Sequence, residues 1–257
     1  MATTYKKRGY KPKNKAEEKH AEEMASTTAE VFNTLDDTAN RSEKWIEKNK
    51  TPLFYGLVAV AVLILGYLAY TKFVGAPTEK EATYELAFPK KYYDAALKSS
   101  GVAVDSLLTL GIEGADGKYG FIDVANTYSG TKAGNMANYY AGLSFLKMKK
   151  YKEAIEYLGK FDSSDELLGP TALGAIGDAF ADINQPKDAI EYYQKAANKQ
   201  TNNFTTPLFL YKAGQIAMSL KEYNKAEKLF TEIKDNYPKS KQGEGIEKYI
   251  NSAKYAQ

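Results

Sequence analysis

Three stretches of the sequence share one pattern: Ala-Gly-Leu-Ser-Phe at 141–145, Ile-Gly-Asp-Ala-Phe at 176–180 and Ala-Gly-Gln-Ile-Ala at 213–217. Beyond each stretch, at the same two distances from its glycine, stand an alanine and then a bulky apolar residue. These positions are Gly142, Ala154 and Leu158; Gly177, Ala189 and Tyr193; Gly214, Ala226 and Phe230. Small residues facing each other let two helices approach closely, so each stretch predicts one packed pair of helices.

The spacing between the three pairs is nearly constant. The glycines stand at 142, 177 and 214, and Pro238 follows the last of them where a closing proline is expected. This pattern resembles the tetratricopeptide repeat (TPR) family, whose unit is about 34 residues long. The resemblance implies an all-α fold in which helix pairs stack into a TPR-like α-solenoid that binds other proteins.

Helices are expected over six ranges in this region: 133–148, 150–161, 165–183, 186–198, 206–220 and 222–236. We assign 136–238 to three TPR-like repeats and 239–257 to a C-terminal capping helix that covers the last repeat. Residues 79–135 are expected to be a degenerate helical repeat: a helix over 79–99 broken at Pro89, a glycine-rich inserted loop, and a short helix over 121–128.

A second decisive stretch lies between Lys50 and Lys72, where 21 residues carry no charge. As a helix they would be about 30 Å long, the thickness of a bilayer's hydrocarbon core. We therefore expect 51–74 to be a single transmembrane signal anchor. A buried helix of a soluble domain is the first alternative. A cleaved signal peptide is the second. Such a peptide has a shorter apolar core and only a short charged region before it, whereas here residues 1–50 precede the span.

The charges flanking this stretch predict its orientation. Four basic residues precede it closely and two follow it: Arg41, Lys44, Lys48 and Lys50, then Lys72 and Lys80. The positive-inside rule then places the N-terminus in the cytoplasm and the C-terminal body across the membrane. In a bacterial inner membrane that body would be periplasmic.

Residues 1–50 are expected to form a partly helical cytoplasmic tail. Apolar and small residues from Met24 to Trp45 recur at alternating spacings of four and three. A loosely helical charged tail and a helix lying on the membrane or on a partner both fit this stripe. The opening of the tail is basic, but acidic residues from Glu17 to Glu23 follow at once. We therefore expect no nucleic-acid binding.

Composition argues against an enzyme. The sequence has no cysteine, one histidine (His20) and a net charge of only +3. Thiolate chemistry, a multi-histidine zinc site and a Ser-His-Asp triad in the body are thereby excluded. The glycines at 111, 114 and 117 lack the spacing of a nucleotide-binding loop, and two carboxylates, Asp178 and Asp182, are too few for a calcium site. We expect no catalytic residue, cofactor or metal.

The TPR resemblance also locates a candidate partner-binding groove on the first helix of each pair. Counting from each glycine, the inward positions are Met136, Tyr139 and Leu143; Thr171, Gly174, Asp178 and Asp182; Leu208, Tyr211, Gln215 and Met218. TPRs that hold a C-terminal carboxylate use Lys, Asn and Arg there, so a carboxylate clamp is not expected. Tyrosine and methionine would instead give broad, adaptable contact with extended segments. The same residues could equally contact the inserted loop.

The cytoplasmic N-terminus, the single span and the TPR-like body together resemble the YfgM-type ancillary subunits of the SecYEG translocon over residues 45–257. Members of that family usually have a shorter cytoplasmic tail, so the resemblance does not account for residues 1–40. The resemblance implies a non-enzymatic inner-membrane adaptor whose partners are SecYEG and periplasmic chaperones or emerging client polypeptides. A TPR scaffold of another envelope assembly, in outer-membrane biogenesis or cell-wall synthesis, is the alternative. An enzyme with an unrecognised site is a third hypothesis, disfavoured by composition.

Overall fold

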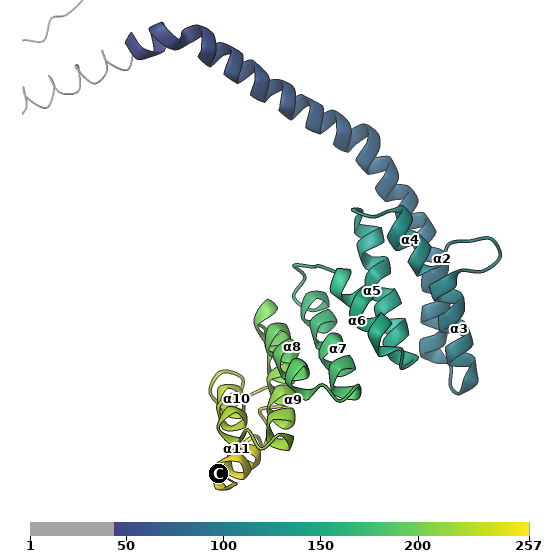
Figure 1. Cartoon of the computed structure of the whole chain (residues 1–257), viewed down its shortest axis with the longest axis vertical. Coiled ribbons are helices and arrows are strands. Elements are labelled where there is room, and N and C mark those ends of the chain that lie inside the picture. The colour runs from purple at the N-terminus through teal and green to yellow at the C-terminus, as the bar shows by residue number, and fades with distance from the viewer. Residues whose placement is uncertain (1–43, 257) are drawn as a thin grey trace, which may run out of the picture. The chain divides into compact units, whose positions relative to one another are not determined.

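A computed structural model describes residues 44–256, and within that range the fold is all-α, as predicted (Figure 1). The helical elements are η1 (Thr71–Gly75), α2 (Ala76–Lys98), α3 (Val102–Glu113), α4 (Phe121–Thr127), α5 (Lys132–Lys147), α6 (Tyr151–Lys160), α7 (Leu168–Asp182), α8 (Pro186–Lys199), α9 (Thr205–Ser219), α10 (Tyr223–Asn236) and α11 (Glu247–Tyr255). The chain divides into two compact units between Tyr70 and Thr71. Each unit is described by itself.

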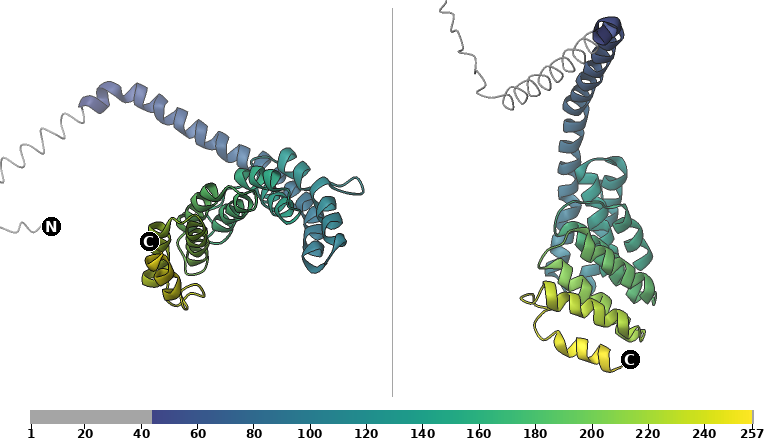
Figure 2. Two further views of the ribbon diagram at one scale, coloured as in Figure 1. Left: turned by 60° about the horizontal axis from the view of Figure 1, so that its bottom comes forward. Right: turned by 90° about the vertical axis from the view of Figure 1, so that its left-hand side faces the viewer.

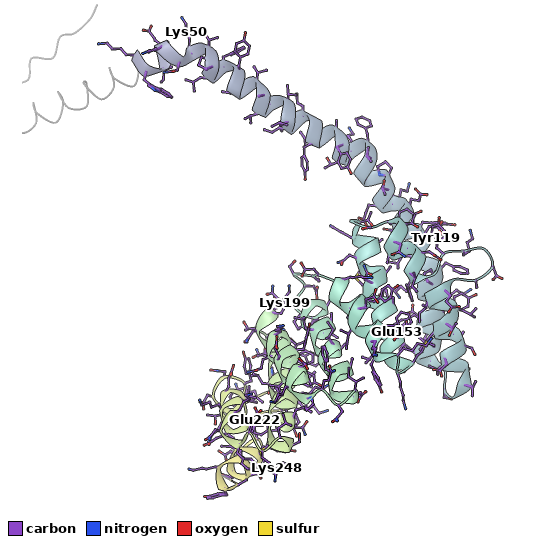
Figure 3. All side chains as sticks on the ribbon, in the orientation of Figure 1. Lys50, Tyr119, Glu153, Lys199, Glu222 and Lys248 are labelled. Atoms are coloured by element: carbon purple, nitrogen blue, oxygen red, sulfur yellow. The ribbon has the colours of Figure 1, made fainter. Side chains whose placement is uncertain are left out.

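In the first unit, residues 44–70 form a helix that continues into the second unit as far as Lys98. By length and composition, Lys44–Lys98 is the one helix within the described range able to cross a membrane, and none of its apolar window is buried. Over residues 44–70 the side chains project outward around the helix (Figure 3), and nearly all of them are exposed. Apart from Trp45, which is exposed, the stripe predicted in the tail lies outside the described residues.

The second unit begins with a five-residue π-helix, η1, and then α2. The break predicted at Pro89 is wrong: α2 runs through this residue. Proline removes one backbone hydrogen bond from a helix, and packing against α3 opposes that loss. Pro89 is buried, and a Cβ added to Gly111 of α3 would lie 3.3 Å from the Pro89 carbonyl oxygen.

The glycine-rich region is shorter as a loop than the sequence suggested. Val102–Glu113 forms helix α3, so only residues 114–120 are left to connect α3 with α4. Gly114 and Gly117 have positive φ angles of 86° and 70°, and Asp116 between them has 54°. These angles close a tight turn, for which Asp and Gly are suited residue types.

Three helix pairs follow, α5/α6, α7/α8 and α9/α10, each packed against the next (Figure 2). The glycine of each first helix faces the bulky apolar residue of the second. A Cβ on Gly142 would lie 2.5 Å from Leu158 Cγ, and one on Gly177 would lie 2.7 Å from the Tyr193 ring. Gly214 meets the Phe230 ring in the same way. The bulky residue, more than the buried alanine, therefore makes glycine necessary.

The turn inside each pair has the same geometry three times. Lys149, Asn184 and Lys221 all have a φ of 60°. The next residue donates its N–H back to the first helix in each case: Lys150 to the Phe145 carbonyl, Gln185 to that of Phe180, and Glu222 to that of Ala217. This is the hydrogen-bond pattern of a Schellman helix stop.

The C-terminal helix α11 begins at Glu247, later than the predicted 239. Residues 238–246 form turns instead, with Gly245 at a φ of 71°. Ile246 and Ala253 are buried, and Tyr249 packs on Tyr211 and Phe230 at the end of the last pair.

Candidate protein-binding groove

The first helices α5, α7 and α9 lie side by side, and their shared surface is called the groove below. Of the positions expected there, Asp182 and Gln215 are exposed. Six more are partly exposed: Met136, Leu143, Thr171, Leu208, Asp178 and Met218. Whether these side chains bind a partner stays a prediction.

The tyrosines offer less open surface than the sequence suggests. Tyr139 is only 7% exposed, and its ring packs 4.9 Å from that of Phe161. Tyr211 lies 5.1 Å from Tyr249 of α11, and the combination of burial and a hydrogen bond with Tyr249 raises the pKa of Tyr211 to about 12. Counting positions along one helix identifies the face of a residue but not the bulk of the neighbour that covers it.

The equivalent position in α7 is Gly174, which is buried. A side chain there would collide with the ring of Phe209 from α9. The same groove position is therefore used for packing against a neighbouring element in all three first helices, at Tyr139, Gly174 and Tyr211, rather than as an open surface.

Asp178 connects three helices. Its Oδ1 atom accepts hydrogen bonds from the Tyr193 hydroxyl of α8, at 2.5 Å, and from Lys212 Nζ of α9, at 2.6 Å. Burial of the Tyr193 ring, together with its bond to Asp178, raises the pKa of Tyr193 well above its ordinary value. Asp178 is therefore a structural acceptor that links two repeats.

Asp182 has a similar partner on the preceding repeat. Partial burial, and then a hydrogen bond with Asp182, raises the pKa of the Tyr151 hydroxyl at the start of α6. The two carboxylates thus hold neighbouring repeats together. Among residues 44–256, no group of three or more metal-ligating side chains lies together.

A hollow of about 370 Å³ opens on the groove between α5 and α7. Its walls come from the end of α5, the turn after it, the start of α6, and helices α7 and α8: Leu146, Lys147, Lys149, Tyr151, Asp178, Ala181, Asp182 and Tyr193. Of this set, the sequence had assigned only the two aspartates to the groove, and Tyr193 to packing within its helix pair. The mixture of apolar, aromatic and charged walls suits a protein side chain more than a small cofactor.

One contact in the second unit had no signal in the sequence. The Glu79 carboxylate of α2 accepts the backbone N–H groups of Lys132, at 2.7 Å, and Ala133, at 3.0 Å. It thereby caps the N-terminus of α5, where an anion is favoured by the helix dipole. Glu79 and Lys132 are 53 residues apart, beyond the reach of any local pattern.

Stacked helix pairs with a shared surface of first helices define an α-solenoid of the repeat-protein class. The repeats are TPR-like: the family model described as Tetratricopeptide repeat matches residues 139–203 and 175–241. No curated protein matches the sequence. Among solved structures, the chain is similar to a Podosopora anserina putative kinesin light chain with nearly identical TPR-like repeats, at 11% identity and a TM-score of 0.47, over 69% of this chain and 87% of that one.

Proposed function

We propose that this protein is a membrane-anchored TPR adaptor that works beside the SecYEG translocon and connects it with periplasmic chaperones or emerging client polypeptides. The apolar helix would anchor the chain in the bacterial inner membrane with the N-terminus in the cytoplasm. The repeats would bind soluble protein partners in the periplasm.

The observation that carries the proposal is the exposed apolar helix continuous with a TPR body. Its most apolar window has a mean hydropathy of 2.2 and no buried residue. Soluble monomers rarely leave so large an apolar surface in water, and a bilayer would cover it. The body in turn offers a groove and a hollow where a protein partner could bind.

Two variants of the full-length protein test this division of labour. The first replaces 51–74 by an unrelated spanning helix and keeps the repeats. The second keeps 1–78 and deletes the repeats. After purification in mild detergent, the first should lose SecYEG but retain soluble periplasmic proteins, and the second should do the opposite. Retention of SecYEG by the repeats alone would invert the assignment.

Crosslinking followed by mass spectrometry in native membranes identifies the assembly. Crosslinks to SecYEG support the proposal. Crosslinks confined to proteins of outer-membrane biogenesis or cell-wall synthesis would instead support a scaffold of another envelope complex.

A further inference from the structure

The turn between α5 and α6 carries a concentration of positive charge that the other two repeats lack. Four exposed lysines surround it, and we call them the basic turn: Lys147, Lys149, Lys150 and Lys152. Within the described range, none of the four forms an ion pair; Lys150 lies 5.9 Å from the centre of the Phe145 ring.

The repeats themselves show that the fold does not need these lysines. The equivalent residues are Asp182, Asn184, Gln185 and Lys187 in the second repeat, and Ser219, Lys221, Glu222 and Asn224 in the third. All three turns have the same φ of 60° and the same backbone hydrogen bonds. A lysine near a helix C-terminus gives some dipole stabilisation, but α7 and α9 end without a basic residue in their last turn.

The basic turn adjoins the hollow in the groove, because Lys147 and Lys149 form part of its wall. Leu146, Ala181 and Tyr151 give the hollow an apolar and aromatic side. Of the acids beside it, Asp178 is paired with Lys212, and Asp182 is hydrogen-bonded to Tyr151. The bond from the neutral Tyr151 hydroxyl does not neutralise Asp182, and Glu153 in the first turn of α6 is a second carboxylate nearby. The four lysines still outnumber these two carboxylates, so positive charge remains in excess at the rim.

We propose that the basic turn and the adjoining hollow bind an acidic segment of a protein partner, with the carboxylates on the lysines and one apolar side chain in the hollow. This inference depends on the proposed function in one respect only, namely that the repeats bind a protein partner. It adds the chemistry of the partner and the repeat that receives it.

Other polyanions fit this surface less well. Four lysines are fewer than the phosphate contacts, about six to ten, that give nucleic-acid binders their affinity. A lipid surface is disfavoured because the basic turn lies at the opposite end of α5 from the start of α2, the helix that follows the apolar segment in the chain. Glu79, at the start of α2, holds the N-terminus of α5, whereas the basic turn follows its C-terminus. The 16 residues of α5 separate the two ends by about 24 Å.

The test measures binding to the full-length protein in phosphatidylcholine nanodiscs by fluorescence anisotropy. The probe is a short fluorescein-labelled peptide of glutamates around one central leucine. Matched peptides carry glutamine for every glutamate, or serine for the leucine. The glutamate peptide should bind more tightly than both, and increasing salt should weaken it.

The decisive variant gives the basic turn residues found in the other repeats: K147S, K149N, K150Q and K152N. Each exposed charge contact contributes modestly, so we expect the Kd for the glutamate peptide to rise about tenfold or more. The control variant removes four exposed lysines elsewhere: K91Q, K98Q, K118Q and K241Q. It should leave that Kd within about twofold of the parent's. The double variant K149N/K150Q supplies an intermediate loss if the quadruple variant folds poorly.

Several results would overturn the proposal. They are no binding of the glutamate peptide to the parent, equal binding of the glutamine peptide, and equal loss in the control variant. Tighter binding of an oligonucleotide of the same charge would assign the turn to nucleic acid instead. None of these results bears on the membrane anchor or on co-purification with SecYEG, so the proposed function stands or falls separately.

Discussion

Replacing Gly142 by alanine tests whether the repeat glycines are there for close helix packing. The added Cβ would lie 2.5 Å from Leu158 Cγ and 2.9 Å from the Leu158 backbone nitrogen. Leu158 is 1% exposed, so its side chain has no open space to enter, and the backbone contact requires α6 itself to move.

The magnitude follows from two opposing effects. Overpacking a core costs about 1–3 kcal/mol, whereas replacing glycine by alanine inside a helix contributes up to about 1 kcal/mol of stability. Because the added Cβ also meets the backbone of α6, the overpacking cost should lie near the upper end of its range, at about 2–3 kcal/mol, and the net destabilisation should be about 1–2 kcal/mol. For a domain of this size that lowers Tm by roughly 2–8 °C.

Gly159 of α6 provides a matched control. It lies in the helix paired with that of Gly142, and no atom lies within 4 Å of a Cβ built on it. Gly159→Ala should therefore raise stability by about 0.5–1 kcal/mol. Both variants are melted as full-length protein in the same detergent, with helicity followed by circular dichroism. A Tm for Gly142→Ala at or above the parent's would refute the packing argument, and so would an equal fall in both variants.

Three further substitutions test the repeat body by the same melting measurement. Gly177→Leu should lower stability by at least about 1–3 kcal/mol because its Cβ alone would meet the Tyr193 ring at 2.7 Å; an unchanged Tm would mean that the ring moves freely. Lys221→Gly should raise stability by about 0.5–1 kcal/mol because glycine adopts the φ of 60° without strain, and a lower Tm would contradict this. Asp178→Ala should cost about 1–2 kcal/mol because the Tyr193 hydroxyl and Lys212 lose their shared acceptor, whereas a neutral result would remove Asp178 from the inter-repeat link.

The helix pairs could be predicted because their signal is local and repeated. The positions of Gly142, Ala154 and Leu158 report one helix-to-helix contact, and two later copies repeat the same spacing. The turns within the pairs fall between the predicted helix ranges, and in the second pair the residue with a positive φ is Asn184, a residue type that adopts this conformation more readily than most.

The regions where prediction failed depend on tertiary contacts. Pro89 and the glycines around α3 are local breaking signals, and packing between α2 and α3 overrides them. The exposure of the groove residues depends on neighbours in other helices: Phe161 at the end of α6 covers Tyr139, and Phe209 of the next repeat covers Gly174, so neither burial had a signal in the residue's own helix. The capping of α5 by Glu79 joins two elements that are far apart in the sequence.

We propose that the apolar helix crosses a membrane and carries the TPR-like body to the far side. Protease added to intact spheroplasts that express the full-length protein tests it most directly, with antibodies against each end of the chain. We expect the body after Lys72 to be digested, while a small N-terminal fragment containing 1–71 is spared until the membrane is dissolved. Complete protection of the body in intact spheroplasts, with digestion of the N-terminal tail, would contradict it.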